Sequence, residues 1–329
     1  MDMTKKLNLY TIIPRLEEMG NDKIKINLDL PQTWGDLTED QLKYVLQLRA
    51  SSTMSAYEIR IAALLRFAHM EERPPHTDAE REMKEKEGYH FMRVPKVIGT
   101  SDKILPLPEW LFLDAVNRLS WLDAPTNDVT RLENIVSRYK PYDATMSDMP
   151  FGVYLQVENH WQVAMSWSKV QADESTDKQV RVEALEHVEK CLEQIARLLY
   201  VPQTKWWQKK PKPFAFSVLM QQNILHWLTG WHSWAVIAYP HLYKSSGNAD
   251  GTVVTSRYLQ EQIDSQISAL TDGDVTKLPH VLEKTTTADA LHILDIKAKE
   301  AAAAKNNSSS NSNGSSSNGS STASFFQLE

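Results

Sequence analysis

Cysteine and glycine are both scarce in this chain of 329 residues. A single cysteine, Cys191, excludes a framework of internal disulfides and is typical of a protein from a reducing compartment. Eleven glycines are too few for the many turns of a β-sandwich or β-barrel, which favours helices. We therefore expect a mainly α fold, with Cys191 as a small core residue on one of its helices.

An excess of positive charge and a long apolar run are also missing. The formal net charge is −6 and the pI about 6.0, so the protein as a whole lacks the basic field typical of nucleic-acid binding. The first ten residues contain no apolar stretch of the kind that a signal peptide needs. The most apolar window, 214–238, is interrupted by Gln, Asn and His and is too polar to span a bilayer. These features predict a soluble, cytoplasmic protein without a membrane partner.

Sequence patterns typical of enzymes and metal sites are absent. The ten histidines are scattered, and none has the four-residue spacing of a zinc-protease helix. The acids in Asp272-Gly273-Asp274 do not have the spacing of a calcium loop, so we interpret them as a turn. Glycine-rich phosphate loops and the nucleophile elbow are missing as well. We expect no catalytic residue, cofactor or metal; a hydrolase whose site is assembled from distant residues is a further alternative.

Composition and hydrophobic periodicity divide the chain into four parts. Residues 1–22 are an N-terminal extension, 23–145 an N-terminal unit, 150–300 a helical unit, and 301–329 a disordered Ser/Asn/Gly linker with a terminal FFQLE peptide. The expected fold is mainly α and bundle-like with a small N-terminal β element, and an α+β arrangement of the N-terminal half is the alternative. Each unit is long enough for its own core, although the two could share one.

The N-terminal unit begins with a predicted strand and two capped helices. Residues 23–30 alternate between apolar and polar side chains, which predicts a half-buried strand. Thr38 and Gln41 have the spacing of a capping box, and so have Ser55 and Glu58. Because few residues separate the two helices that follow these boxes, we expect an αα-hairpin.

Further along this unit, a charged run precedes several short strands. Residues 78–87 alternate in sign, which indicates a solvated helix face or loop. Short strands are expected at 89–94, 96–98 and 104–107. Pro108 is placed to open a helix over 109–119.

The helical unit contains long amphipathic stretches. We expect helices at the start of this unit, from Pro150, and over 216–238. In the second of these, Trp227, Trp231 and Trp234 are expected as core residues, and the alternative is that some of these rings anchor a protein interface. A helix of about five turns is predicted between them by apolar residues at steps of three and four, Val182, Leu185, Val188, Leu192, Ile195 and Leu199.

Residues 258–299 combine a helix, a polar break and a second helix. An apolar stripe is formed by Leu259, Ile263, Ile267 and Leu270, and Gln266 is one of the polar residues that fall off it. Gly273 is suited to a left-handed residue after the first helix. Thr286 is placed to cap the last helix, so the segment is interpreted as a packing and partner-binding module.

One loop interleaves basic and aromatic residues. Its chemistry suits stacking on single-stranded nucleic acid, and the alternative is a loop whose Trp side chains pack inward while its lysines face solvent. The residues that carry this possible nucleic-acid contact are Lys205, Trp206, Trp207, Lys209, Lys210 and Lys212.

The end of the chain combines a flexible linker with an apolar peptide. About twenty residues of linker reach on the order of 25 Å. The candidate partner-binding residues are Phe325, Phe326 and Leu328, which could dock on a partner protein or on a sister copy of this chain. The alternative is a disordered terminus without a role.

Three stretches of the chain carry a resemblance to known sequences. They are LPQTWGDLTEDQLKYVLQL near the start, PEWLFLDAVNRLSWLDAPT in mid-chain and LQEQIDSQISALTDGDVTKLPHVLEKTTTADALHILDIKAKE near the end. The matching residues are Trp34, Leu37, Thr38, Gln41, Tyr44, Ala269, Leu270, Thr271, Gly273, Asp274, Thr276, Lys277 and Leu282. In these stretches the chain resembles a family of uncharacterised proteins from prophages and phages of Bacteroides-type gut bacteria.

The resemblance implies a protein that is encoded near phage tail genes. It suggests a non-enzymatic protein of tail assembly or virion structure, such as a chaperone for the tape-measure protein, located in the cytoplasm of the bacterial host or in the virion. Its partners would be tail or tape-measure proteins. A nucleic-acid-binding accessory protein of phage replication or packaging, using the loop from Lys205 to Lys212, is the alternative.

Overall fold

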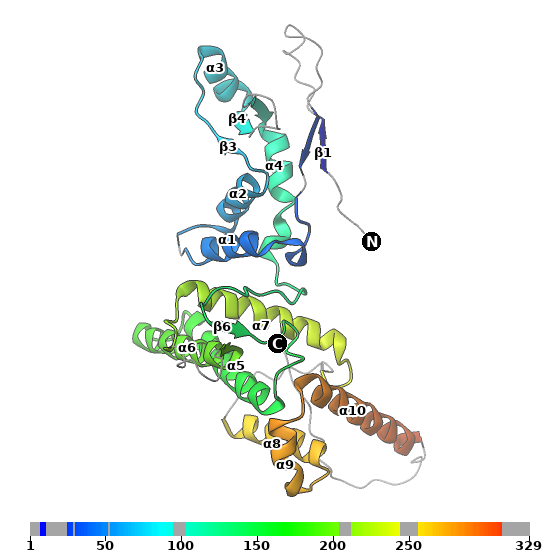
Figure 1. Ribbon diagram of the computed structural model, residues 1–329. Coiled ribbons are helices and arrows are strands. Elements are labelled where there is room, and N and C mark those ends of the chain that lie inside the picture. Colours follow the sequence, from blue (N-terminus) through cyan, green and yellow to red (C-terminus); the bar gives the residue numbers. More distant parts are fainter. Residues whose placement is uncertain are drawn as a thin grey trace. The chain divides into compact units, whose positions relative to one another are not determined.

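The computed structural model of the chain is mainly helical with small antiparallel sheets, which confirms the expected fold class (Figure 1). Contacts between residues divide the chain into two units, Met1–Pro125 (unit 1) and Thr126–Glu329 (unit 2). The residues whose structure is described are 7–10, 25–28, 30–51, 53–94, 103–203, 212–243 and 256–310.

Unit 1 alternates helices with short strands. Strands β1 and β2 pair antiparallel, and β3, β4 and β5 form a second antiparallel sheet in that order. The described elements are β1 (Leu7–Tyr10), β2 (Lys25–Leu28), η2 (Trp34–Asp36), α1 (Glu39–Arg49), α2 (Ala56–Phe67), β3 (Glu71–Glu72), α3 (Asp78–Glu87), β4 (Tyr89–Val94), β5 (Lys103–Pro108), α4 (Glu109–Asn117) and η3 (Ser120–Asp123).

The capping boxes of unit 1 begin its helices where the sequence predicted them. At α1 the backbone N–H of Thr38 donates to Gln41 Oε1 over 2.9 Å, and the Gln41 N–H donates back to the Thr38 hydroxyl over 3.3 Å. Ser55 and Glu58 repeat this exchange at α2. Each box satisfies N–H groups that the first helical turn leaves unpaired.

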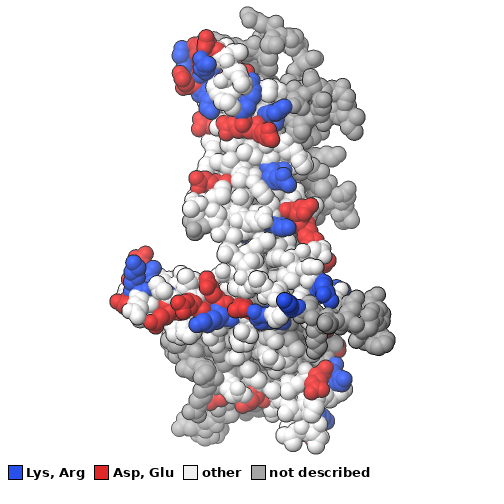
Figure 2. All heavy atoms as spheres, turned by 60° about the vertical axis from the view of Figure 1, so that its left-hand side comes forward, with Lys and Arg blue, Asp and Glu red and all other residues white. Residues whose placement is uncertain are grey.

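The core of unit 1 lies between α1, α2, α4 and the β3–β4–β5 sheet. Val45, Leu46, Met92 and Val116 are fully buried there. The charged helix α3 lies outside this core, because none of its residues is buried. Figure 2 shows Lys or Arg and Asp or Glu side chains mixed over this helix at the upper end of the view, as expected for a solvated face.

Some expectations for unit 1 differ in extent from the structure. The strand expected over 23–30 is β2, which is shorter, and the burial of its side chains lies outside the described residues. The strand expected over 96–98 also lies outside them. The helix expected over 109–119 ends at Asn117, where a 3-10 turn replaces it.

Unit 2 is a bundle of helices with one small strand pair. The hairpin of α5 and α6 is crossed by α7, and β6 pairs antiparallel with β7 (Figure 1). The described elements are β6 (Tyr139–Pro141), α5 (Phe151–Ala172), α6 (Lys178–Leu199), β7 (Tyr200–Pro202), α7 (Val218–Ala238), α8 (Ser256–Thr271), η4 (Val275–Lys277), α9 (Leu278–Glu283) and α10 (Thr287–Ser310).

The core of unit 2 is built on the tryptophans of α7. Trp227 and Trp231 are fully buried, and Trp234 is half-buried against the same core. Tyr154 of α5 packs against Trp231 with ring centroids 5.3 Å apart. The prediction that these tryptophans are core residues is confirmed for Trp227 and Trp231, whereas Trp234 lies at the edge of the core.

The division between the units falls at Pro125, before the boundary of 145–150 expected from the sequence. Residues 126–149 belong to unit 2 because their backbone and side chains bind α7. The Thr130 hydroxyl lies 2.7 Å from His226 Nε2, and the Leu132 N–H donates to Asn223 Oδ1 over 2.8 Å. These contacts join residues that are 96 and 91 positions apart, so local sequence patterns did not indicate them.

Two predicted apolar stripes need correction. On α6, Val182 and Leu185 are exposed, and Ala184 is buried in their place. Val182 lies about 120° around the helix from the buried Val188, since each residue turns the helix by about 100°. On α8, Gln266 was expected off the apolar stripe, yet it is only 2% exposed.

The last helix also runs further than expected. The linker was predicted to begin at residue 301, but α10 continues to Ser310. The alanines after residue 300 have the highest helix propensity of all residues, which explains why the helix continues into the polar tract. Its predicted cap is present, because the Asp289 N–H donates to the Thr286 hydroxyl over 3.2 Å.

Candidate protein-binding groove

A groove of about 570 Å³ lies on unit 2 between α5, α8 and α9. Its position depends on a close approach at Gly152, near the start of α5. A Cβ at this position would lie 2.8 Å from the backbone oxygen of Leu282, so the residue that lets α9 approach α5 this closely is glycine. Gly152 and Leu282, which meet at this approach, both line the groove.

Hydrogen bonds hold the start of α5 close to the end of α9 as well. The Phe151 N–H donates to the Thr285 carbonyl over 3.0 Å. Both the N–H and the hydroxyl of Thr287 donate to the Met149 carbonyl, each over 2.8 Å. Thus the start of α5 is held to the junction between α9 and α10.

The surface of the groove is mixed in character. Its apolar side chains include Val153 and Leu155 from α5, Ile263 and Ile267 from α8, and Leu282 from α9. Its polar groups are Gln156, Asn159 and Glu283, and none of the described residues that line it is a lysine or arginine. Such a lining suits apolar side chains of a ligand, with amides available for hydrogen bonds.

Glu158, next to the groove residue Asn159 on α5, belongs to a buried ion pair. Glu158 Oε2 is 2.9 Å from His232 Nε2, and His232 Nδ1 is 2.7 Å from the Leu228 carbonyl. Because the Leu228 carbonyl only accepts hydrogen bonds, Nδ1 carries a proton. When Glu158 is ionised it also only accepts, so Nε2 then carries a proton too and His232 is an imidazolium. Trp161 stacks on this ring with centroids 5.3 Å apart.

The pKa values of this pair are shifted in opposite directions. Burial alone would raise the pKa of Glu158, but the charge and hydrogen bond of His232, with a hydrogen bond from Gln162, outweigh it and lower that pKa. Burial alone would lower the pKa of His232, but the charge and hydrogen bond of Glu158 outweigh it and raise that pKa. Both shifts favour the charged pair.

The space beside Glu158 is small. A cavity of about 10 Å³ is lined by Glu158, Gln162 and Gln266 among others, which is roughly the volume that a single water needs. The buried Oε1 of Gln266 has no hydrogen-bond partner among the described residues. Leu155, Asn159 and Ile263 line both this cavity and the groove, so Glu158 lies beside the wall of the groove.

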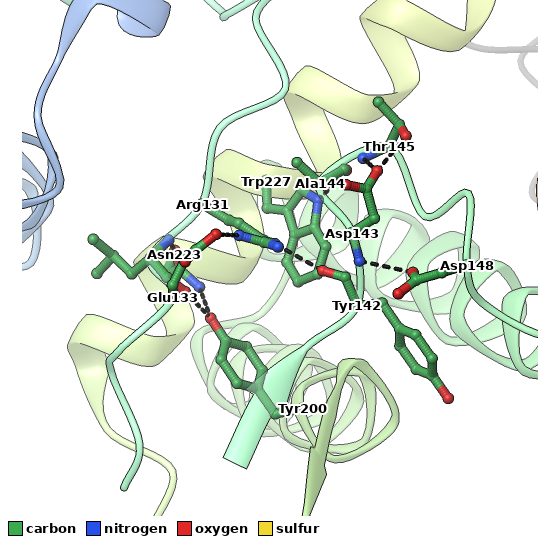
Figure 3. Close-up of polar contacts among 11 residues, drawn as sticks. Arg131, Glu133, Tyr142, Asp143, Ala144, Thr145, Asp148, Tyr200, Asn223 and Trp227 are labelled. Atoms are coloured by element: carbon green, nitrogen blue, oxygen red, sulfur yellow. Dashed lines mark hydrogen bonds and ion pairs between the residues drawn. The ribbon is translucent and has the colours of Figure 1, made fainter. Parts of the chain in front are cut away.

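A second polar network holds residues 126–149 on the core of unit 2 (Figure 3). Asn223 Nδ2 donates to the Tyr200 hydroxyl over 2.8 Å, and that hydroxyl donates to the Leu132 carbonyl over 2.6 Å. Since the Leu132 N–H donates to Asn223 Oδ1, the three residues form a closed and buried ring of hydrogen bonds. This ring joins α7 to the start of β7.

Arg131 extends the network over Trp227. Its guanidinium lies 5.4 Å from the centre of the Trp227 ring and donates to the Tyr142 carbonyl over 2.9 Å (Figure 3). The indole N–H of Trp227 donates to the Ala144 carbonyl over 2.7 Å. The network is structural, because each of these groups binds another part of the same unit.

The sequence-predicted binding residues lie mostly outside the described part of the chain. This holds for Phe325, Phe326 and Leu328 and for the basic and aromatic residues Lys205, Trp206, Trp207, Lys209 and Lys210. Lys212 is exposed, and its carbonyl accepts a hydrogen bond of 3.2 Å from the Tyr139 hydroxyl. Their proposed contacts with partner proteins or nucleic acid stay predictions.

The sequence patterns did not predict the groove. The stripe of Ile263 and Ile267 was seen, but nothing showed that α5 and α9 would leave a groove beside it.

Cys191, expected in the core, is half-buried, and burial raises the pKa of its thiol.

Comparisons with known proteins give no relative. No protein-family model, no curated protein and no solved structure matches the chain.

Within the described ranges, no three His, Cys, Asp or Glu side chains gather in a way that could hold a metal ion. No helix in that part of the chain is long and apolar enough to cross a membrane.

Proposed function

We propose that this is a non-enzymatic phage or prophage protein that acts through protein–protein contacts in tail assembly or tail structure, as a tail-assembly chaperone does. The observation that carries the proposal is the groove between α5, α8 and α9, with its apolar lining and its amide groups. The sequence resemblance to phage proteins supports the phage tail as the place where such contacts are made.

The partner that fits this groove is an amphipathic segment of a tail or tape-measure type protein. Its apolar side chains would pack on Val153, Ile263 and Ile267, and its backbone or polar side chains would bind Gln156 and Asn159. Glu283 at the groove favours a partner that carries Lys or Arg near its apolar residues.

The experiment that tests this proposal is co-purification from prophage-induced cells. Gln156 lines the groove and is exposed, so Gln156→Arg adds a bulky charge there without disturbing the core. Gln179→Arg is the matched control, because Gln179 is exposed on α6 and outside the groove. The proposal expects a tail or tape-measure protein, identified by mass spectrometry, with the wild type and the control but not with Gln156→Arg. Recovery of no tail protein, or equal recovery with both variants, contradicts it.

A further inference from the structure

The small cavity between α5 and α8 contains a buried hydrogen-bond acceptor without a donor. Gln266 is only 2% exposed, and its side-chain Oε1 has no hydrogen-bond partner among the described residues. Such an oxygen is costly, because it has lost its hydrogen bonds to solvent and gained none within the protein. Most buried polar atoms in folded proteins are bound by another group or by an ordered water. Gln266 Oε1 therefore requires a donor from within the cavity.

The size and the lining of this cavity match a single water. Its volume of about 10 Å³ is close to the least that one water needs. Besides Gln266 of α8, the polar side chains of Glu158 and Gln162 from α5 line it. A buried water typically makes about three hydrogen bonds, whereas a cavity with a purely apolar lining stays dry. The cavity is therefore polar enough to hold a water, and too small for a larger ligand.

The side chains of α5 can complete the hydrogen bonds of such a water. Glu158 Oε2 lies 2.9 Å from His232 Nε2, and Glu158 Oε1 accepts a hydrogen bond of 2.6 Å from Gln162 Nε2. Because a carboxylate oxygen accepts two hydrogen bonds, Oε1 has room for another, and the Gln162 amide has a second N–H. One water can thus donate to Gln266 Oε1 and Glu158 Oε1 and accept from Gln162, which makes three hydrogen bonds.

We propose that this cavity is a binding site for one structural water, which joins Gln266 of α8 to Glu158 of α5. The water extends the buried pair of Glu158 and His232 from α5 and α7 to α8, and all of these residues belong to unit 2. Since Ile263 lines both the cavity and the groove, the water also holds this part of the groove lining in place. The inference does not depend on what the groove binds.

A crystal structure of the full chain at high resolution tests this proposal directly. The expected result is a well-ordered density peak at hydrogen-bond distance, about 2.7–3.2 Å, from Gln266 Oε1, Glu158 Oε1 and Gln162 Nε2. A cavity without such a peak would overturn the proposal. A reversed Gln266 amide, whose nitrogen donates directly to the Glu158 carboxylate, would overturn it as well, because no acceptor would then need a water.

Magnetic relaxation dispersion of solvent water gives a second readout, because it counts long-lived internal waters in solution. Gln266→Met replaces the amide by an apolar side chain of similar length, so the water loses a partner and the count falls by one. Gln260→Met is the matched control, because Gln260 is exposed on the same helix and does not line the cavity. An equal count for the wild type and Gln266→Met would contradict the proposal.

Urea unfolding of the same variants distinguishes a satisfied oxygen from an unsatisfied one. If the water binds Gln266, Gln266→Met removes a hydrogen bond and raises the unfolding equilibrium constant about fivefold. The control Gln260→Met loses only an exposed bond of 2.8 Å to Asp264, so the constant changes about twofold or less. A Gln266→Met protein at least as stable as the wild type would overturn the proposal, because removal of an unpaired buried acceptor costs nothing.

Discussion

Glu158 on α5 and His232 on α7 form an ion pair across the core of unit 2, with 2.9 Å between Oε2 and Nε2. The two side chains are 7% and 9% exposed, so both charges are almost fully removed from water. A buried pair of this kind is costly to break, because the remaining charge has no compensating partner. The pair therefore ties the wall of the groove to the tryptophan core.

Removing one partner of this pair should destabilise the protein strongly. We expect Glu158→Ala to lower the free energy of unfolding by about 3–5 kcal/mol, since it leaves a buried imidazolium unpaired. The control is Glu193→Ala, which removes the half-exposed ion pair with Arg197 and should cost less than about 1 kcal/mol. Urea unfolding followed by circular dichroism measures both. Equal effects of the two substitutions would show that the buried pair is not ionised.

The same pair predicts how stability depends on pH. The pKa of His232 is raised above its ordinary value of 6.5, so its contribution is complete below that pH and is lost as pH rises through the raised pKa. The pKa of Glu158 is lowered below its ordinary value of 4.5, so its contribution is complete above that pH and is lost as pH falls through the lowered pKa. The contribution of the pair is therefore largest between about pH 4.5 and 6.5.

Urea unfolding of the wild type and of His232→Gln across pH 5 to 9 checks this dependence. We expect the wild type to lose stability above pH 6.5 through the histidine, and the variant to lack that part of the loss. A wild type and variant with parallel profiles would contradict the assignment of a charged His232.

The ring of Asn223, Tyr200 and Leu132 gives a third prediction. Asn223→Leu keeps the approximate volume but leaves the buried Leu132 N–H without its acceptor and removes a donor from the Tyr200 hydroxyl. The expected cost is about 2–3 kcal/mol, because buried polar groups lose their partners. Tyr200→Phe, which removes one hydroxyl from the ring, should cost less than Asn223→Leu. The reverse order would mean that Asn223 is not central to the ring.

Two glycines of unit 2 provide a matched pair of substitutions. Gly152→Ala places a Cβ 2.8 Å from the Leu282 carbonyl oxygen, so α9 must shift at a cost of about 1–3 kcal/mol. Gly273→Ala meets nothing within 4 Å and is strained by its φ of 76° alone, which costs about 1 kcal/mol. Thermal unfolding gives the two costs. If Gly152→Ala proved harmless, the close approach of α5 and α9 would be in doubt.

The parts of the fold that sequence alone predicted are those fixed by neighbours in the chain. Thr38 and Ser55 begin helices because their partners lie three residues away, and Gly273 takes the left-handed conformation at the end of α8 as expected. Trp227 and Trp231 were placed in the core because apolar residues surround them on their own helix.

The parts that sequence did not predict depend on distant residues. Glu158 and His232 are 74 positions apart, and no sequence pattern near either residue predicts that they pair. Gln266 was expected off the apolar stripe because it is polar, whereas packing against α5 buries it beside Glu158. The groove lies between three helices, and the approach of two of them, α5 and α9, depends on Gly152. Long-range packing of this kind overrides the local pattern.

The central claim, that the groove on unit 2 binds a tail protein, is tested most directly by the affinity of the purified partners. Isothermal titration of the recovered tail or tape-measure protein would be carried out with the wild type, with Gln156→Arg and with Gln179→Arg. The account predicts at least about tenfold weaker binding for Gln156→Arg, because a buried unpaired charge at the interface costs more than 1.4 kcal/mol. The same dissociation constant for all three proteins would contradict it.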